Sequence, residues 1–406
     1  MANYVYSLAK QFSDFYQACR VLQEPDQATR DFRLSLTACV KQVLANGLTL
    51  LRCHRPGQQV VAVEINLAAP LDAEPEGLDG VATIMARALS EGTDKHSAEE
   101  FAAELERCGA TLDAHADHPG IRVSLEVPAS RLAKALGLLA EALRAPAFAD
   151  SEVDRLVRNR LDEIPHELAN PQRRAAKQLS QELFPATLRM SRPRQGTEET
   201  VARIDSAAVR AFYEAHVRPA TATAVVVGDL TGIDLDAVLA DTLGPWTGGT
   251  AAPLPVPAIT ADDTGRVVIV DRPGAVQTQL LIGRIGGDRH DRVWAAQVLG
   301  TYCLGGTLTS RLDKVLREEK GYTYGAYSFF NASIYPGAFR ASTQVRNDVT
   351  DGSMHELMYE FKRIRDEAVP AKELTEAQHA IVAQFALSLE SPQELLNYWL
   401  TSQYYG

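Results

Sequence analysis

The sequence has few cysteines, and none of them stands in a paired motif. The five are far apart and odd in number (Cys19, Cys39, Cys53, Cys108 and Cys303). Scattered thiols without a CxxC spacing fit a reducing compartment. The chain also lacks an apolar run long enough to cross a bilayer, and its first residues, MANYVYSLAKQFSDFYQ, carry charges where a signal peptide needs an apolar block. These absences predict a cytoplasmic protein.

Positive charge is scarce relative to negative charge, since the formal net charge is −11. This balance argues against a general nucleic-acid binder, which needs a basic surface. The hydrophobic content of 46% and the charged content of 23% are ordinary for a globular protein with a sizeable core. A chain of 406 residues is expected to form two or three domains.

The nine histidines form no HxxEH or HxxxH motif, the spacings that place two imidazoles on one face of a helix. One cluster remains. His115 and Asp117 alternate along a predicted strand, with His118 next to them. The three side chains could bind a metal, but a polar strand face toward solvent or a groove is the favoured interpretation.

The chain does contain an internal repeat. NGLTLLRCHR and QVVAVEINLAA predict two strands, and GRVVIVDRP and AVQTQLLIGRIGG echo them in the second half. The predicted fold is α+β, with two homologous α/β-sandwich-like repeats in which helices pack on a mixed or antiparallel sheet. We expect a short helical extension over 1–45, a first domain over 46–246, a linker over 247–262 and a second domain over 263–406.

The stretch GGTLTSRLDKVLREEKGYTYGAYSFF predicts a helix, a glycine and a strand. Ser310 and Asp313 have the spacing of a capping box, and Gly321 stands where a C-cap glycine ends a helix. Arg317 then lies in the last helical turn and Tyr324 in the strand. Such a junction can bring a guanidinium and a phenol together to donate hydrogen bonds to a carbonyl oxygen or an oxyanion. An aromatic core strand after a surface helix is the alternative.

Taken together, these segments resemble the pitrilysin/insulinase-type metallopeptidase family over about residues 46–406. GGTLTSRLDKVLREEKGYTYGAYS is similar to the family's second-half signature, and ALSEGT, RQGTEETVARI and FYEAHVRPATATAVVVGD are similar to other family segments. The resemblance implies a pitrilysin-type fold. It also implies that Arg317 and Tyr324, which stand at the family's arginine and tyrosine positions, contact the carbonyl group of a peptide substrate.

This sequence departs from the family at the zinc motif. Active members carry HxxEH on the first-half helix that ends in Gly-Thr, plus a later glutamate, which together supply the zinc ligands and a general base. Counted back from that Gly-Thr pair, this chain has Thr83, Ala86 and Arg87, and only Glu163 of the expected set is kept. Because these side chains cannot replace imidazoles or move a proton, we expect no zinc on this chain and no hydrolysis by it alone.

The missing zinc motif implies that this chain works together with a partner subunit. In one branch of the family, a subunit with HxxEH pairs with a subunit that lacks it, and the second lends its Arg/Tyr pair to a shared chamber. This sequence resembles that second subunit, so zinc is expected in the partner and an extended peptide is expected to pair with an edge strand near 110–117. A structural or assembly protein without a role in proteolysis is the alternative, and a homodimer is also open.

The sequences at the two ends of the chain support further predictions. YVYSLAKQFSDFYQACRVL and RDFRLSLTACVKQVLANGLTLL, within residues 1–52, resemble the last helices of the anticodon-binding domain of arginyl-tRNA synthetase. The rest of that domain does not precede them, so tRNA binding is not favoured. The second half stops at LTSQYYG, where the first half continues to its strand VVVGDL. We therefore expect the second sheet to lack its last strand and to expose an edge.

Overall fold

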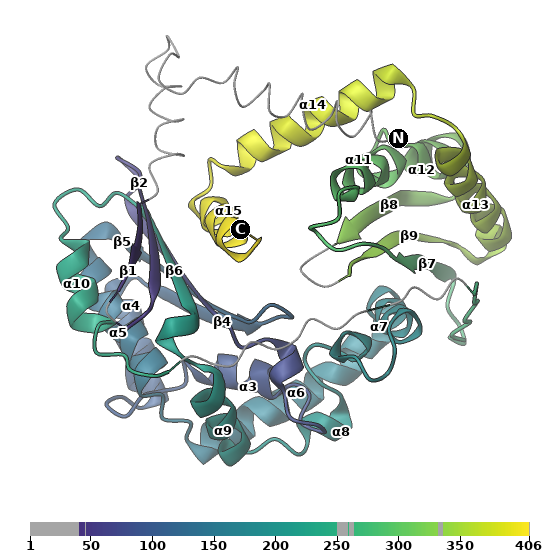
Figure 1. The fold of residues 1–406 in the computed structure, drawn as a ribbon. Coiled ribbons are helices and arrows are strands. Elements are labelled where there is room, and N and C mark those ends of the chain that lie inside the picture. The colour runs from purple at the N-terminus through teal and green to yellow at the C-terminus, as the bar shows by residue number, and fades with distance from the viewer. Residues whose placement is uncertain (1–39, 45, 250–258, 260–263, 332–335, 406) are drawn as a thin grey trace, which may run out of the picture. The chain divides into compact units, whose positions relative to one another are not determined.

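The computed structural model describes residues 40–44, 46–249, 259, 264–331 and 336–405 (Figure 1). The described residues divide into two compact units. The first-sheet unit contains residues up to Ile164, Pro193–Leu254 and the end of the chain from Leu387, whereas the second-sheet unit contains Pro165–Arg192 and Pro255–Ala386. Neither unit is continuous in sequence. In the described part of the chain, no helix is long and apolar enough to cross a membrane.

The first sheet has six strands in the order β1-β2-β6-β3-β5-β4. Their bounds are Val40–Val43, Thr49–His54, Val60–Leu67, Thr111–Ala116, Ile121–Pro128 and Ala222–Gly228 for β1 to β6. All neighbours are antiparallel except β2 and β6, which are parallel. The central strands are rich in valine and isoleucine and buried on both faces, as expected for strands covered by helices on both sides.

The second sheet has three described strands in the order β7-β9-β8, all antiparallel. They are Gln277–Ile285 (β7), Thr323–Asn331 (β8) and Ala338–Arg346 (β9). This order repeats β3-β5-β4 of the first sheet, so both halves pair the strand before the first helix with the second strand of the following hairpin. The predicted α+β repeat is confirmed.

Helices cover the sheets in each unit. In the first-sheet unit they are Val81–Ala88 (α3), Ala98–Cys108 (α4), Leu132–Arg144 (α5), Asp150–Ala169 (α6, most of it), Glu198–Val201 (α8), Ser206–His216 (α9), Leu235–Thr242 (α10) and Pro392–Tyr405 (α15). In the second-sheet unit they are Pro171–Leu183 (α7), Trp294–Gly305 (α11), Arg311–Asp313 (α12), Thr350–Asp366 (α13) and most of Ala371–Ser388 (α14).

Helix α15, from the end of the chain, packs on the first sheet. Its leucines Leu395, Leu396 and Leu400 join Val225 and Val227 of β6 in one buried cluster. Helix α7, which precedes β6 in the chain, packs instead on β7 of the second sheet. The compact units therefore differ from the predicted ranges 46–246 and 263–406, because each sheet is covered by a helix that belongs in sequence to the other repeat. The predicted linker 247–262 lies mostly outside the described residues.

Two secondary-structure predictions are wrong. The helical extension predicted over 1–45 is not helical at its end, since Val40–Val43 is β1, which pairs antiparallel with β2 through a tight turn at Gly47. Residues 40–43 form a strand because β2 supplies hydrogen-bond partners for their backbone groups, which an isolated helix end would not have. Residues 1–39 of the predicted extension lie outside the described residues. The second error is GRVVIVDRP, since residues 265–273 form no strand.

Candidate functional site

Arg317 lies in a helix that changes from α-helical to π-helical hydrogen bonding. Helix α12 continues as a π-helical segment, Lys314–Glu319, in which the N–H of Lys320 bonds to the carbonyl of Val315 at 3.0 Å. Gly321 then takes a positive φ of 64°, and β8 begins at Thr323. The predicted order of helix, glycine and strand is confirmed, and the π turn is a feature that the sequence pattern did not indicate.

Asp313 connects this helix to the strand. Its carboxylate is fully buried, with Oδ2 accepting a hydrogen bond from Arg317 Nη1 at 3.1 Å and Oδ1 accepting one from the N–H of Ala326 at 3.2 Å. The predicted capping box is wrong, because the hydroxyl of Ser310 donates to the carbonyl of Thr307 instead. The i, i+4 spacing of Asp313 and Arg317 was the available signal for their ion pair.

Tyr324 points into solvent, with 92% of its surface exposed. The register of β8 against β9 shifts between Thr323 and Ala326, so a bulge lies at this position in the strand. The Arg317 side chain is 40% exposed, and no hydrogen bond joins it to the Tyr324 phenol. The structure therefore places both residues at one helix–strand junction, held by Asp313, with donor groups of each open to a ligand.

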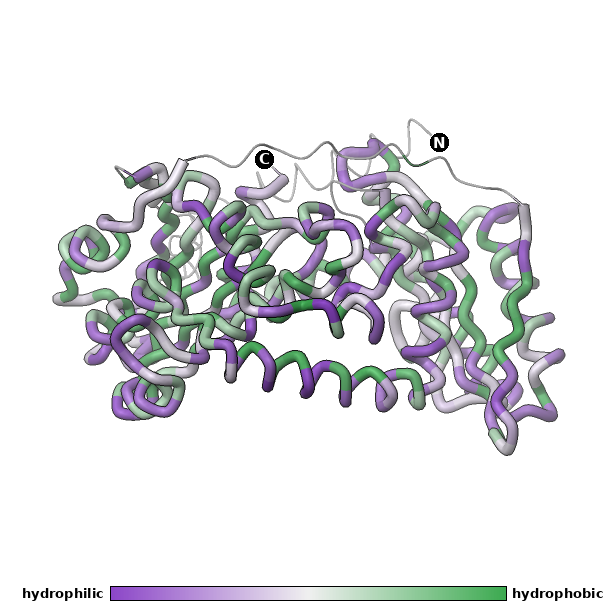
Figure 2. The backbone as a smooth tube through the Cα atoms, turned by 90° about the horizontal axis from the view of Figure 1, so that it is seen from below, coloured by the Kyte–Doolittle hydropathy of each residue, from purple (hydrophilic) through white to green (hydrophobic). Residues whose placement is uncertain are grey.

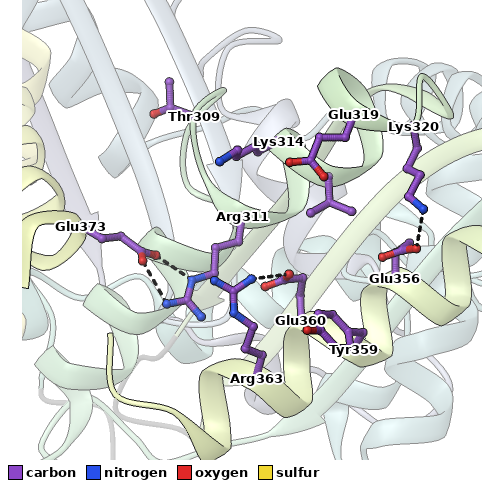
Figure 3. Close-up of a pocket in the computed structure, with 11 residues that line it drawn as sticks. Thr309, Arg311, Lys314, Glu319, Lys320, Glu356, Tyr359, Glu360, Arg363 and Glu373 are labelled. Atoms are coloured by element: carbon purple, nitrogen blue, oxygen red, sulfur yellow. Dashed lines mark hydrogen bonds and ion pairs between the residues drawn. The ribbon is translucent and has the colours of Figure 1, made fainter. Parts of the chain in front are cut away.

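A second charged cluster lies below the same helix (Figure 3). Arg311 is only 7% exposed and makes two hydrogen bonds to Glu373 at the start of α14, at 2.8 and 3.0 Å. Nearby, Arg363 donates to the buried Glu360 at 2.8 Å. The picture shows the Arg311 and Arg363 guanidinium groups next to each other, each directed at its own carboxylate. The Arg311–Glu373 pair joins α14 to the helix that carries Arg317, whereas Arg363 and Glu360 both lie on α13.

The zinc-motif positions lie on α3 in the other unit. Thr83 and Ala86 are buried, and Arg87 stands in the last turn of the helix. Arg87 makes a two-pronged ion pair with Glu163 of α6, with Nη1–Oε1 and Nη2–Oε2 distances of 2.9 and 3.1 Å. The structure thus brings Arg87 and Glu163 together.

A second arginine, missed in the sequence, holds the same carboxylate. Arg160 is 1% exposed and donates from Nη1 to Glu163 Oε2 at 3.0 Å, while its Nε donates to the carbonyl of Gln195. Partial burial acts to raise the pKa of Glu163, but the hydrogen bonds from Arg87 and Arg160 outweigh it and lower the pKa. Two guanidinium groups around one carboxylate leave a net positive charge, which does not suit a metal cation.

No group of three histidine, cysteine or acidic side chains in the described part of the chain is arranged to hold a metal. This includes His115, Asp117 and His118, at the end of the β4–β5 hairpin. Asp117 faces Arg122, whose guanidinium also lies 3.5 Å from the buried Glu64. Among the described strands, β4 lies at one of the two edges of the first sheet, as the edge-pairing hypothesis requires.

Comparison with known proteins gives two long matches to one peptidase family. Residues 51–194 match the insulinase domain of peptidase family M16, and residues 203–381 match the peptidase M16 inactive domain. Residues 1–57 match the DALR anticodon binding domain.

Relatives support both assignments. An uncharacterized zinc protease of Rickettsia bellii is 24% identical over 359 residues, which cover 87% of this chain and 84% of the relative. One from Bacillus subtilis is 23% identical over 364 residues, covering 85% and 83%. The arginine–tRNA ligase of Ectopseudomonas mendocina is 49% identical over 51 residues, but these make up 13% of this chain and 9% of the ligase.

Solved structures agree on the fold. The peptidase M16 inactive domain from Pseudomonas fluorescens superposes with a TM-score of 0.77 at 24% identity, covering 85% of this chain and 83% of that chain. A protease from Helicobacter pylori gives 0.82 at 16% identity, covering 90% and 89%. The repeated sheets and these matches define a two-repeat α+β protein with the fold of the M16 structures. The chain belongs to peptidase family M16, the insulinase family, and its first residues match the DALR domain.

Proposed function

We propose that this chain is a non-catalytic subunit of a zinc metallopeptidase. The observation that carries the proposal is the ion pair between Arg87 and Glu163, at two of the positions where an active member holds zinc. A guanidinium already neutralises the carboxylate, and neither Thr83 nor Ala86 offers a ligand or a base. Zinc and the general base then come from a partner subunit with HxxEH.

The contribution of this chain is peptide binding. Arg317 and Tyr324 present a guanidinium and a phenol on one surface, and both donate hydrogen bonds. Aimed at the oxygen of a scissile carbonyl, they stabilise the negative charge that develops there during attack by water. Separately, β4 has an unpaired edge among the described strands, and its backbone groups can pair with an extended peptide.

The test uses the full chain purified with an HxxEH-bearing homologue and a quenched fluorescent peptide. The double variant Arg317→Ala with Tyr324→Phe is expected to lower kcat about a hundredfold or more, as loss of oxyanion donors does. Arg365→Ala with Tyr359→Phe, which changes the same residue types at exposed positions, serves as the control. Unchanged cleavage with the first double variant rejects the shared-site mechanism and favours the alternative, an assembly protein without a role in proteolysis.

A further inference from the structure

A polar cavity of about 470 Å³ lies beside the helix that carries Arg317 (Figure 3). Its walls come from α12 with the π-helical segment, from α13 and from the start of α14, all within the second-sheet unit. The volume is in the usual range for small-molecule sites. Arg317 and Tyr324 do not line this cavity, so it is separate from the pair that is proposed to bind the peptide carbonyl.

Charged side chains make up most of the cavity wall. Along the helices of this unit, hydrophilic residues alternate with hydrophobic ones (Figure 2), and the wall contains four basic and four acidic side chains. Six of these form three ion pairs: Arg311 with Glu373, Arg363 with Glu360, and Lys320 with Glu356. The other two, Lys314 and Glu319, are exposed and make no side-chain hydrogen bond or ion pair with any described residue. The cavity therefore presents one cation and one anion that are not paired within the described part of the chain.

Two buried atoms of the cavity wall also lack partners. Arg311 uses Nε and Nη2 to bind Glu373, and its Nη1 makes no hydrogen bond to a described residue, although Arg311 is only 7% exposed. Glu360 accepts a hydrogen bond from Arg363 through Oε1, and its Oε2 is likewise unpaired in a residue that is 1% exposed. Buried polar atoms in native proteins nearly always have a partner. A donor and an acceptor left over in the wall of one cavity indicate a ligand.

The unpaired groups are of both signs, which limits the chemistry of that ligand. An anion such as phosphate would satisfy Arg311 and Lys314, but it would be repelled by the carboxylates of Glu319 and Glu360. A metal cation would meet the opposite problem, and no group of three metal-binding side chains is arranged here among the described residues. A molecule that carries both an ammonium and a carboxylate group satisfies both sets.

We propose that this cavity binds a small zwitterion with an ammonium and a carboxylate group, as free amino acids and dipeptides have. The carboxylate of the ligand accepts a hydrogen bond from Arg311 Nη1 and pairs with Lys314. Its ammonium group donates to Glu360 Oε2 and pairs with Glu319. Hydrogen bonds between charged groups are the strong ones, so a ligand that makes both contacts is selected over a molecule with one charge.

Isothermal titration calorimetry of the full chain, without a partner subunit, tests this site with L-alanine and L-alanyl-L-alanine as probes. We expect saturable binding, and the probe that binds more tightly identifies the source of the zwitterion. N-acetyl-alanyl-alanine keeps only the carboxylate, and alanyl-alanine amide keeps only the ammonium group. Both are expected to bind at least about tenfold more weakly than alanyl-alanine, because each loses a charged hydrogen bond to a buried group.

Variants at the two exposed positions locate the site without disturbing the core. Lys314→Gln with Glu319→Gln is expected to weaken binding about fivefold or more and to leave folding unchanged, because both side chains are exposed. Lys362→Gln with Glu318→Gln changes the same residue types at exposed positions outside the cavity wall, and this control is expected to bind normally. Amide hydrogen exchange in the π-helical segment should slow when the probe is bound.

Several results would overturn the proposal. Absence of saturable binding for both probes up to about 10 mM would show that the cavity holds only solvent. Equal binding of either blocked dipeptide would show that one charge is enough. A loss of binding that the control variant shares would place the ligand elsewhere. None of these measurements involves peptide cleavage or a partner subunit, so this site and the proposed function can fail separately.

Discussion

Arg87 and Glu163 face each other through two parallel hydrogen bonds, with N–O distances of 2.9 and 3.1 Å between helices α3 and α6. Planar guanidinium and carboxylate groups match in this geometry, which makes the pair stronger and more directional than a single contact. The two residues are 76 apart in sequence, and the fold brings together positions that the family resemblance had linked.

The first prediction rebuilds the zinc motif. The combined change Thr83→His, Ala86→Glu and Arg87→His writes HxxEH on α3 and removes the guanidinium from Glu163. Because two imidazoles and a carboxylate make a catalytic-type zinc set, about one zinc per chain is expected after dialysis, measured by plasma mass spectrometry. Adding Glu163→Ala should lower the zinc content. A folded triple variant without zinc would show that these positions do not correspond to the family's ligands.

The second prediction concerns the stability that Glu163 provides. Its pKa is lower in the folded chain than the ordinary value of 4.5, so the ion pairs stabilise the fold at neutral pH and lose this effect as pH falls through the folded pKa. Glu163→Gln should cost about 1–2 kcal/mol at pH 7 in urea unfolding, a modest value because the side chain is 40% exposed. The difference from wild type should shrink below pH 4.5. Glu199→Gln, on the exposed Arg203 pair, should cost less than about 0.5 kcal/mol.

The third prediction concerns Asp313. Asp313→Ala removes the partner of Arg317 and leaves the N–H of Ala326 buried without an acceptor, so a loss of about 2–4 kcal/mol is expected. Asp313→Asn keeps an acceptor for Ala326 and should cost less. Chemical denaturation measures both, with the exposed Asp348→Ala as control. Equal losses for alanine and asparagine would contradict the bridging role.

The fourth prediction concerns the buried guanidinium in Figure 3. Glu373→Ala leaves Arg311 buried without its main partner, and a loss of about 3 kcal/mol or more is expected in thermal or urea unfolding. Replacing both partners, as Arg311→Met with Glu373→Leu, should cost less than the single change, because no charge then remains buried. If the double variant is less stable than Glu373→Ala, the loss of stability comes from the missing ion pair and not from an unpaired buried charge.

The fifth prediction concerns Cys303. Burial, together with the nearby Glu373 carboxylate, raises the pKa of its thiol to about 11. The thiolate is the reactive form, so Cys303 should resist maleimide at pH 7.5 in the folded chain and react rapidly in urea. Peptide mass spectrometry after timed labelling distinguishes it from the other cysteines. Fast labelling under native conditions would show that the core around α11 opens readily.

Local pattern was enough for the elements around the candidate site. The glycine at 321 and the aromatic run after it fixed the helix–strand junction, because a positive φ and β-forming side chains act over a few residues. The capping box at Ser310 failed for a tertiary reason. The local pattern predicts a cap at Asp313, but the N–H of Ala326, thirteen residues later, and the Arg317 guanidinium bind the same carboxylate instead.

The sequence pattern did not predict the contacts between residues that are far apart in the chain. Nothing near Glu163 indicates that the buried Arg160 reaches Gln195 while also pairing with the carboxylate. The pattern of residues 265–273 is that of a strand, yet a strand exists only where a neighbour supplies hydrogen bonds, and none is described there.

The sequence by itself determined the repeated α+β architecture, the α3 positions without zinc ligands, and the junction that carries Arg317 and Tyr324, because periodicity, turn residues and side-chain chemistry are local properties. Only the tertiary structure decided which helix covers which sheet and which carboxylate each buried arginine pairs with. Those outcomes depend on burial and hydrogen-bond competition between segments that are distant in sequence, and no local pattern encodes that competition.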